Sequence, residues 1–200
     1  MKVVTESTDP SWAISRSRDR LSAAQRRSVA AALDLFGEFG VSATSFQMVA
    51  DAVGVTKAAV YHQFKTKDAL VLAVAEVELS SLEEAVNQAE AETSRRAARA
   101  LLLAKVIDLA VVRRRWVNAL QGDPVIIRLL GSFEPFVGLM TRLYALLLDE
   151  NADAGSQVRT AIVSSAIGGA IVHPLVVGLD DDTLRAELLN VTKRFFDLPD

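Results

Sequence analysis

The 200-residue chain contains no cysteine. This absence excludes disulfide bonds, thiolate catalysis and zinc sites built from thiolates. Histidine is scarce, with two residues in total, so no His-rich metal pattern is present, and no glycine-rich phosphate loop occurs either. We therefore predict no metal and no cofactor. The lack of cysteine is compatible with a reducing cytoplasm, where we expect the protein to act.

Long apolar runs are also missing. No run of about 18 apolar residues is free of charges and helix breakers, so we expect no membrane span. The first residues are polar and charged, so we expect no signal peptide. Aromatic residues make up 6% of the chain although half of it is hydrophobic, and Ala, Leu and Val dominate. That composition favours helix over sheet, and we predict an all-α protein.

The small net charge of −3 hides an uneven distribution. Residues 1–70 carry nine Lys and Arg against seven Asp and Glu, whereas residues 71–200 carry thirteen against eighteen. A basic N-terminal part suits contact with a polyanion. The excess is small, and ordinary scatter of surface charge is the alternative explanation.

Residues 1–20 show no apolar periodicity, and we predict a flexible arm. The arm contains several arginines, so contact with DNA phosphates or a minor groove is one role open to it. The alternative is a solvated tail. We expect residues 21–66 to form one domain and residues 67–200 to form a second, helical domain.

A helix-turn-helix is predicted near residues 44–64. A supporting helix begins after Ser22 and stops at Gly40, which suits a helix C-terminus. Thr44 or Ser45 can cap the next short helix, and Thr56 can cap the one after it. Gly54 lies between these two short helices and accepts a positive φ without strain, as a tight turn requires.

The outer face of the helix after Gly54 is small and polar. Val49, Val55 and Val60 are expected to point inward as a shared core. Lys57, Ala58, Tyr61 and His62 then remain outside, and a helix with such a face fits the major groove of DNA.

Residues 29–72 resemble the DNA-binding region of the tetracycline-repressor (TetR) family. The matching residues are Phe36, Phe39, Gly40, Ala43, Thr44, Val49, Ala50, Ala52, Val53, Gly54, Val55, Thr56, Val60, Tyr61, Phe64, Lys65, Lys67 and Leu70. This string is much more specific than a bare helix-turn-helix pattern, and it covers about a quarter of the chain.

The resemblance implies DNA-contact roles for eight residues: Thr44, Ser45, Thr56, Lys57, Ala58, Tyr61, His62 and Lys67. Thr44 and Lys67 would hold phosphates, and Tyr61 would contact phosphate or sugar. Lys57 and His62 would face bases, and Lys57 is able to reach guanine O6 or N7. Thr56 is either a helix cap or a donor to phosphate. The alternative for Tyr61 is a core residue, and the alternative for His62 is a solvated side chain without a specific role.

The rest of the chain is predicted to add six helices, which makes about nine in all. A long helix starts at Lys67, and a mostly buried one covers residues 95–120. Arg113, Arg114 and Arg115 lie within the latter, and we interpret them as cations near a helix C-terminus rather than as DNA contacts. The remaining expected helices cover residues 124–131, 134–148, 156–173 and 182–196.

The resemblance also implies that the second domain binds a small ligand and dimerises. The predicted pocket residues are Trp116, Phe133, Phe136, Met140, Tyr144 and Val163. The predicted polar anchors are Glu134, Asn118, Arg142 and His173. An apolar wall with few polar groups suits a hydrophobic ligand, although apolar residues at helical spacing also make ordinary core.

Residues 156–173 and 182–196 are expected to pair with a second copy, so that a homodimer reads a pseudo-palindromic operator in double-stranded DNA. The predicted function is a transcriptional repressor released by a small hydrophobic ligand. The alternatives are an activator with the same fold and, less well supported, a small helical enzyme, for which we find no catalytic constellation.

Overall fold

The computed structural model describes residues 21–148, 153–196 and 198, so the predicted arm at residues 1–20 lies outside the described part of the chain. Within the described residues there are ten helices and no strand, which confirms the all-α prediction. The helices are α2 (Ala23–Ala43), α3 (Phe46–Val53), α4 (Lys57–Gln63), α5 (Lys67–Glu90), α6 (Arg95–Val112), α7 (Arg114–Gly122), α8 (Pro124–Gly131), α9 (Glu134–Leu147), α10 (Ala154–Ile171) and α11 (Asp181–Phe195).

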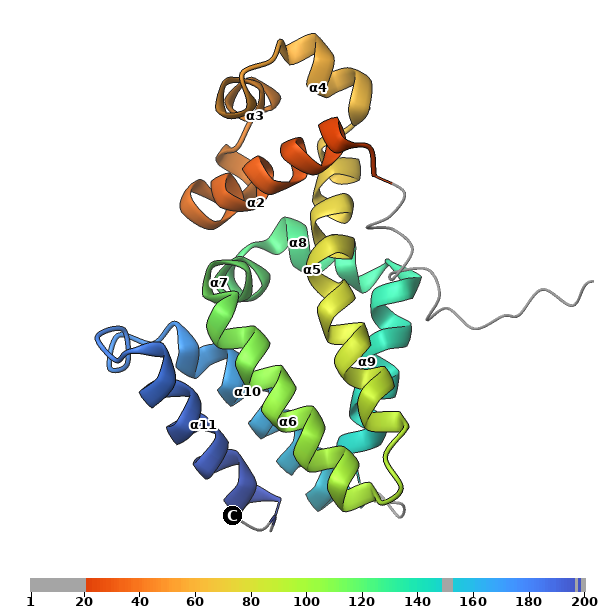
Figure 1. Cartoon of the computed structure of the whole chain (residues 1–200), viewed down its shortest axis with the longest axis vertical. Helices are drawn as coiled ribbons and strands as arrows, with labels where there is room; N and C mark the ends of the chain where they lie inside the picture. The colour runs from red at the N-terminus through yellow and green to blue at the C-terminus, as the bar shows by residue number, and fades with distance from the viewer. Residues whose placement is uncertain (1–20, 149–152, 197, 199–200) are drawn as a thin grey trace, which may run out of the picture.

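Figure 1 shows two parts joined by α5. Helices α2, α3 and α4 gather at one end, and the remaining helices form a longer body into which α5 runs. Helix α6 packs between α5 and α11 in that body, and α7 packs against α2. The contact of α7 with α2 therefore connects the body to the N-terminal helices by a route other than the continuous helix α5.

Side-chain caps set most helix starts. Ser22, Ser45 and Thr56 each accept a backbone N–H from the first turn of α2, α3 and α4. Ser22 also forms a capping box with Gln25. These bonds satisfy N–H groups that have no partner inside the helix. The choice left open between Thr44 and Ser45 is thus decided in favour of Ser45.

Aspartate side chains cap helices of the body by accepting backbone N–H groups of the first turn. Asp180 accepts the N–H of Thr183 at 2.9 Å at the start of α11. This backbone hydrogen bond holds the pKa of Asp180 below its ordinary value, because it stabilises the ionised carboxylate. Asp153 caps α10 in the same way.

The core of the N-terminal part forms as predicted. Val49, Ala50 and Val60 are fully buried, and Val55 is partly buried against them. Gly54 has the left-handed conformation, with φ 76° and ψ 37°. Helices α3 and α4 pack against each other across the turn at Gly54, and the N–H of Val55 just after this turn donates to the carbonyl of Ala50 at 2.9 Å.

The end of α2 lies close to the predicted position. Gly40 has φ 79° and ψ 161°, which breaks the helix before a last short turn. The N–H of Val41, exposed by this break, donates to Oδ2 of Asp123 at 2.7 Å. Asp123 also accepts the N–H of Val125 through Oδ1 at 2.9 Å, as the cap of α8. One carboxylate therefore holds together the end of α2 and the start of α8.

The prediction of one continuous helix over residues 95–120 is wrong. The chain breaks at Arg113, which has φ −108° and ψ 30°, and α7 starts afresh at Arg114. This break accounts for ten helices instead of nine. No glycine or proline in the sequence marks this break. Helix α7 packs against α2, and we attribute the change of direction at Arg113 to that contact.

No single helix in the described part of the chain is long and apolar enough to span a membrane. Helices α8 and α9 meet that test only when taken together, and they are bent by 84° with respect to each other.

Replacing Gly54 by Ala should destabilise the protein. A Cβ at Gly54 meets no atom within 4 Å, so the cost comes only from the positive φ and should be about 1 kcal/mol. For a chain of this size a loss of about 1 kcal/mol lowers the melting temperature by about 2–4 °C. Thermal unfolding followed by circular dichroism measures the change.

Gly131→Ala is the matched control. Its Cβ also meets no atom within 4 Å, but its φ is not positive, so the melting temperature should stay the same or rise slightly. Equal losses in the two variants would contradict this explanation.

Candidate DNA-binding face and ligand pocket

The outward face of α4 contains the side chains expected to meet DNA. Lys57, Ala58, Tyr61 and His62 are all exposed, whereas Val60 on the opposite face is fully buried. Helix α4 is the second helix of the helix-turn-helix and lies at one end of the molecule (Figure 1). A short helix that presents small and cationic side chains in this way is able to enter a major groove.

Neighbouring side chains hold Tyr61 in place. Its ring packs edge-on against Phe46 of α3, with centroids 6.3 Å apart and an interplanar angle of 68°. The ammonium of Lys65 lies 5.3 Å from the ring centroid. Tyr61 still exposes 53% of its surface, so it is a surface side chain, and its predicted contact with phosphate or sugar stays a prediction.

Ser45 and Thr56 combine two properties at the helix-turn-helix surface. Each hydroxyl oxygen accepts a backbone N–H of its own helix at 3.2 Å, and both residues are exposed. Because the hydroxyl is only an acceptor in this bond, its own hydrogen is available to an external acceptor such as a phosphate. Helix capping and phosphate contact are therefore compatible at these positions.

Thr44 and Lys67 have internal partners instead. Thr44 is 2% exposed, and its hydroxyl donates to the carbonyl of Gly40 at 2.8 Å. The ammonium of Lys67 donates to the carbonyls of Val41 and Ser42 at 2.8 and 3.0 Å. Both residues stabilise the end of α2. Burial gives Thr44 a structural role in this conformation. The ammonium of Lys67 has a third N–H donor, and its contact with a DNA phosphate stays a prediction.

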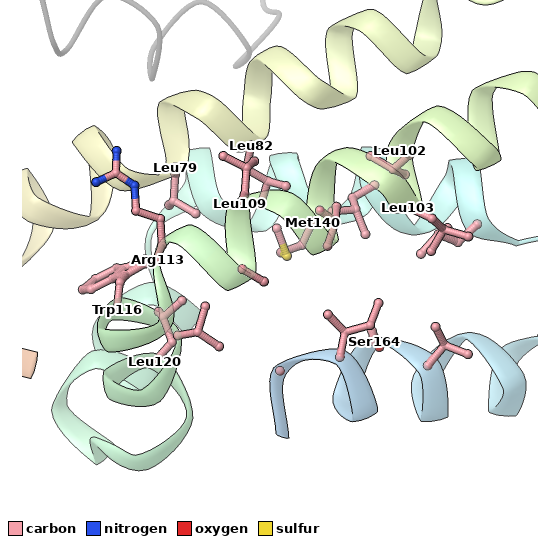
Figure 2. Close-up of a pocket in the computed structure, with 18 of the residues that line it drawn as sticks. Leu79, Leu82, Leu102, Leu103, Leu109, Arg113, Trp116, Leu120, Met140 and Ser164 are labelled. Atoms are coloured by element: carbon pink, nitrogen blue, oxygen red, sulfur yellow. The ribbon is translucent and has the colours of Figure 1, made fainter. Parts of the chain in front are cut away.

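An apolar cavity of about 230 Å³ lies inside the body. Figure 2 shows Arg113, Trp116 and Leu120 at one end, Leu102 and Leu103 at the other, and Met140 between them. The side chains that surround the cavity come from α5, α6, α7, α9 and α10: Glu78, Leu79, Leu82, Leu102, Leu103, Val106, Leu109, Ala110, Arg113, Trp116, Val117, Leu120, Met140, Leu143, Tyr144, Leu147, Val163, Ser164, Ile167 and Gly168.

Four of the six predicted pocket residues line this cavity, namely Trp116, Met140, Tyr144 and Val163. Phe133 and Phe136 do not. Both are partly buried and pack against the hydrophobic core near the start of α9. Helical spacing indicates that a side chain faces inward, but it does not separate core from cavity wall.

None of the four predicted polar anchors lines the cavity. Glu134, Asn118 and His173 are exposed on the surface. Arg142 pairs with Glu90, at 2.6 Å between Nη2 and Oε2. These expectations fail because the direction of a polar side chain depends on how its helix is rotated, which the sequence pattern left undetermined.

The charged groups of the cavity are Glu78 and Arg113, which sequence reasoning missed as pocket residues. Nε of Arg113 lies 3.4 Å from a carboxylate oxygen of Glu78. The Glu78 side chain is 3% exposed and that of Arg113 is 42% exposed, so the carboxylate is inside and the guanidinium leans outward. The acid lies within an apolar stretch of α5, and that unusual position was the available sequence signal.

A second apolar groove separates α10 from α11, with a volume of about 250 Å³. Ile162, Val191 and Phe195 line it and remain about half exposed. The described residues contain no group of three or more His, Cys, Asp or Glu side chains placed to hold a metal ion.

This architecture, a helix-turn-helix mounted on a helical body, defines a class of DNA-binding regulator. Residues 29–74 match the family model described as bacterial regulatory proteins, tetR family. None of the curated proteins compared with the chain matches it.

Many solved structures have the same fold. A TetR-family regulator from Bordetella parapertussis is 18% identical, with a TM-score of 0.67 over 89% of this chain and 96% of that one. PfmR from Thermus thermophilus is 16% identical, with a TM-score of 0.66 over 90% and 99%. FadR from Bacillus subtilis, solved with stearoyl-CoA, is 16% identical, with a TM-score of 0.65 over 84% and 96%.

The match over residues 29–74 shows that the N-terminal part of the chain is similar to the DNA-binding region of TetR-family regulators, and the solved structures show that the chain has the same overall fold as these regulators.

Replacing Lys57 by Ala should reduce sequence preference. If Lys57 contacts a base, its loss should weaken binding to the operator by about 1–3 kcal/mol and weaken binding to random DNA much less. Fluorescence anisotropy at fixed salt, with an operator selected from a random pool, measures both affinities.

Lys105→Ala is the control, because it removes the same charge from an exposed position on α6, away from the helix-turn-helix. It should leave both affinities nearly unchanged. Equal losses on operator and random DNA for Lys57→Ala would show that Lys57 touches phosphate only.

Proposed function

We propose that this chain is a homodimeric transcriptional repressor that leaves its operator when a small hydrophobic molecule fills the cavity of its body. The observation that carries the proposal is the double role of α7. One face of α7 lines the cavity through Trp116, Val117 and Leu120, and the same helix packs against α2, the support of the helix-turn-helix.

The contact between α7 and α2 is close enough to transmit movement. A Cβ at Gly37 of α2 would lie 3.0 Å from Cβ of Arg115, so the backbone of α2 lies directly against the side chain of Arg115. The guanidinium of Arg115 also lies 3.8 Å from the carboxylate of Asp34. Both groups of this ion pair are about three-quarters exposed, so it adds little energy, and steric contact dominates.

Asp123 supports the same route of communication. Its carboxylate joins the end of α2 to the start of α8 through hydrogen bonds of 2.7 and 2.9 Å. A shift of α7 displaces Asp123, which directly follows it, and with it the end of the supporting helix. We propose that a ligand which binds the shifted arrangement more tightly moves the population away from the form that binds DNA.

The apolar wall of the cavity supports a hydrophobic ligand. Most of its residues are aliphatic. The volume of about 230 Å³ lies somewhat below the range of about 300–1,000 Å³ that is usual for drug-sized ligands, so the cavity suits a small or slender molecule. FadR from Bacillus subtilis holds stearoyl-CoA on a similar fold, which supports the ability of this architecture to hold an aliphatic chain.

The groove between α10 and α11 supports the homodimer. Ile162, Val191 and Phe195 together expose a continuous apolar surface on two neighbouring helices. Exposed apolar patches of this kind mark interaction surfaces. Pairing with the same two helices of a second copy would bury them in a four-helix bundle.

The dimer would present two α4 helices to DNA. Two recognition helices about 34–36 Å apart, or a multiple of that spacing, read two half-sites of a pseudo-palindrome. In this proposal residues 21–66 are the DNA-binding domain and residues 67–200 are the domain for ligand and dimer.

The protein should bind DNA that flanks its own gene. A gel shift with flanking fragments, and with a random DNA pool at low salt, should show a specific complex. Transcription in vitro from the bound promoter then distinguishes repression from activation. Absence of a complex with both DNAs would contradict DNA binding, and stimulated transcription would contradict the repressor role.

Replacing Val191 by Asp should disrupt the dimer. A charge in the groove between α10 and α11 would be buried without a partner in the dimer, which costs several kcal/mol. We expect a monomer by light scattering after size-exclusion chromatography, and operator affinity should fall because only one half-site is held.

Val137→Asp is the matched control. Val137 is 45% exposed on α9 and Val191 is 50% exposed, so the same substitution is made at similar exposure away from the groove. This variant should remain a dimer. A dimeric Val191→Asp protein, or equal effects of both variants, would contradict the assignment of the interface.

A further inference from the structure

The polar end of the cavity has a chemistry that a purely hydrophobic ligand does not use. The carboxylate of Glu78 and the indole of Trp116 both line that end, and both side chains are at most 5% exposed. A carboxylate and an aromatic face are the two groups that proteins use to hold organic cations. The remaining wall is almost wholly apolar.

The cation that now pairs with Glu78 belongs to the protein itself. Arg113 contacts the carboxylate through Nε at 3.4 Å, and its side chain is 42% exposed. Figure 2 shows its guanidinium pointing away from Met140, Leu102 and Leu103. Because the guanidinium already reaches solvent, it can leave Glu78 at little cost if another cation replaces it.

A neighbouring cavity has room for the displaced side chain. This second space, of about 280 Å³, shares Glu78, Arg113 and Trp116 with the first and also includes Asp34 of α2. A guanidinium that leaves Glu78 in this direction approaches the carboxylate of Asp34. Ligand binding would then add a charge contact to the helix that supports the DNA-binding domain.

We propose that the natural ligand is an amphiphilic cation, with an apolar chain or ring system among the leucines and an ammonium group between Glu78 and Trp116. This inference rests on the proposed function, since it names the ligand class of the same cavity. A lipophilic anion fits less well. It would have to compete with Glu78 for Arg113 and would place a second negative charge close to a buried carboxylate, which is unfavourable.

Three probes with the same ten-carbon chain test the proposal: decyltrimethylammonium, 1-decanol and decanoate. Isothermal titration calorimetry on the full-length protein without DNA, below micelle concentrations and at low salt, should show the ammonium binding about tenfold more tightly than the other two. Equal affinities, tighter binding of decanoate, or no binding of any probe would overturn the ligand class.

Two variants locate the effect. Glu78→Gln should reduce the affinity for the ammonium about tenfold, as expected for loss of a buried charge partner, and change that for decanol little. Glu76→Gln, which removes the same charge from α5 outside the cavity, should leave both affinities unchanged. Parallel losses for ammonium and decanol in Glu78→Gln would overturn the proposal.

Arg113→Met keeps the test decisive if Glu78→Gln does not fold. Removal of the competing guanidinium should raise the affinity for the ammonium, and an unchanged or lower affinity would overturn the displacement of Arg113.

Operator binding is measured separately by anisotropy. If the operator binds normally while no probe shows the expected preference, the ligand class fails and the proposed repressor remains. If the ammonium binds through Glu78 but the operator complex persists, the ligand class stands and release by ligand fails.

Discussion

Helix α2 has to bury two faces at once, and the rest of the structure depends on this constraint. Ala32 and Phe36 are buried with the core of the helix-turn-helix. On the other side, Gly37 lies against Arg115 of α7 so closely that a methyl group would touch it. A helix held from both sides cannot move relative to the body without changing the position of α4. The same packing that stabilises the N-terminal domain therefore couples its position to that of the body.

The polar contacts around α2 reinforce this packing. Asp123 accepts the N–H of Val41, and Lys67 donates to the carbonyls of Val41 and Ser42. Both contacts satisfy backbone groups where Gly40 interrupts the helix, and such groups are costly when buried without partners. These hydrogen bonds also join three elements that are distant in sequence, because the end of α2 contacts the start of α5 through Lys67 and the start of α8 through Asp123.

The cavity and the groove between α10 and α11 show two different uses of apolar surface. In the cavity the aliphatic side chains leave space between five helices, and a single buried carboxylate gives the space a polar end. In the groove, Val191 and Phe195 face solvent. An enclosed space suits a small molecule, whereas an exposed groove with apolar side chains along its sides suits another protein surface.

The amino-acid sequence by itself was sufficient for the local features of this protein. Helix caps such as Ser22 and Thr56, the turn at Gly54, and the inward valines of α3 and α4 depend on residues a few positions apart, so their pattern is visible in the chain. The residues that match the family model, 29–74, lie in the same helix-turn-helix region, where short-range patterns dominate.

Tertiary structure alone decided the remaining features. The break at Arg113 has no local breaker and follows from the packing of α7 on α2. The rotation of each body helix determined that Trp116 lines the cavity while Phe136 joins the core. Thr44 and Lys67 acquired partners nine or more residues away in the chain. Contacts of this kind depend on where whole helices come to lie, and a periodic pattern along one helix contains no information about the helix that will face it.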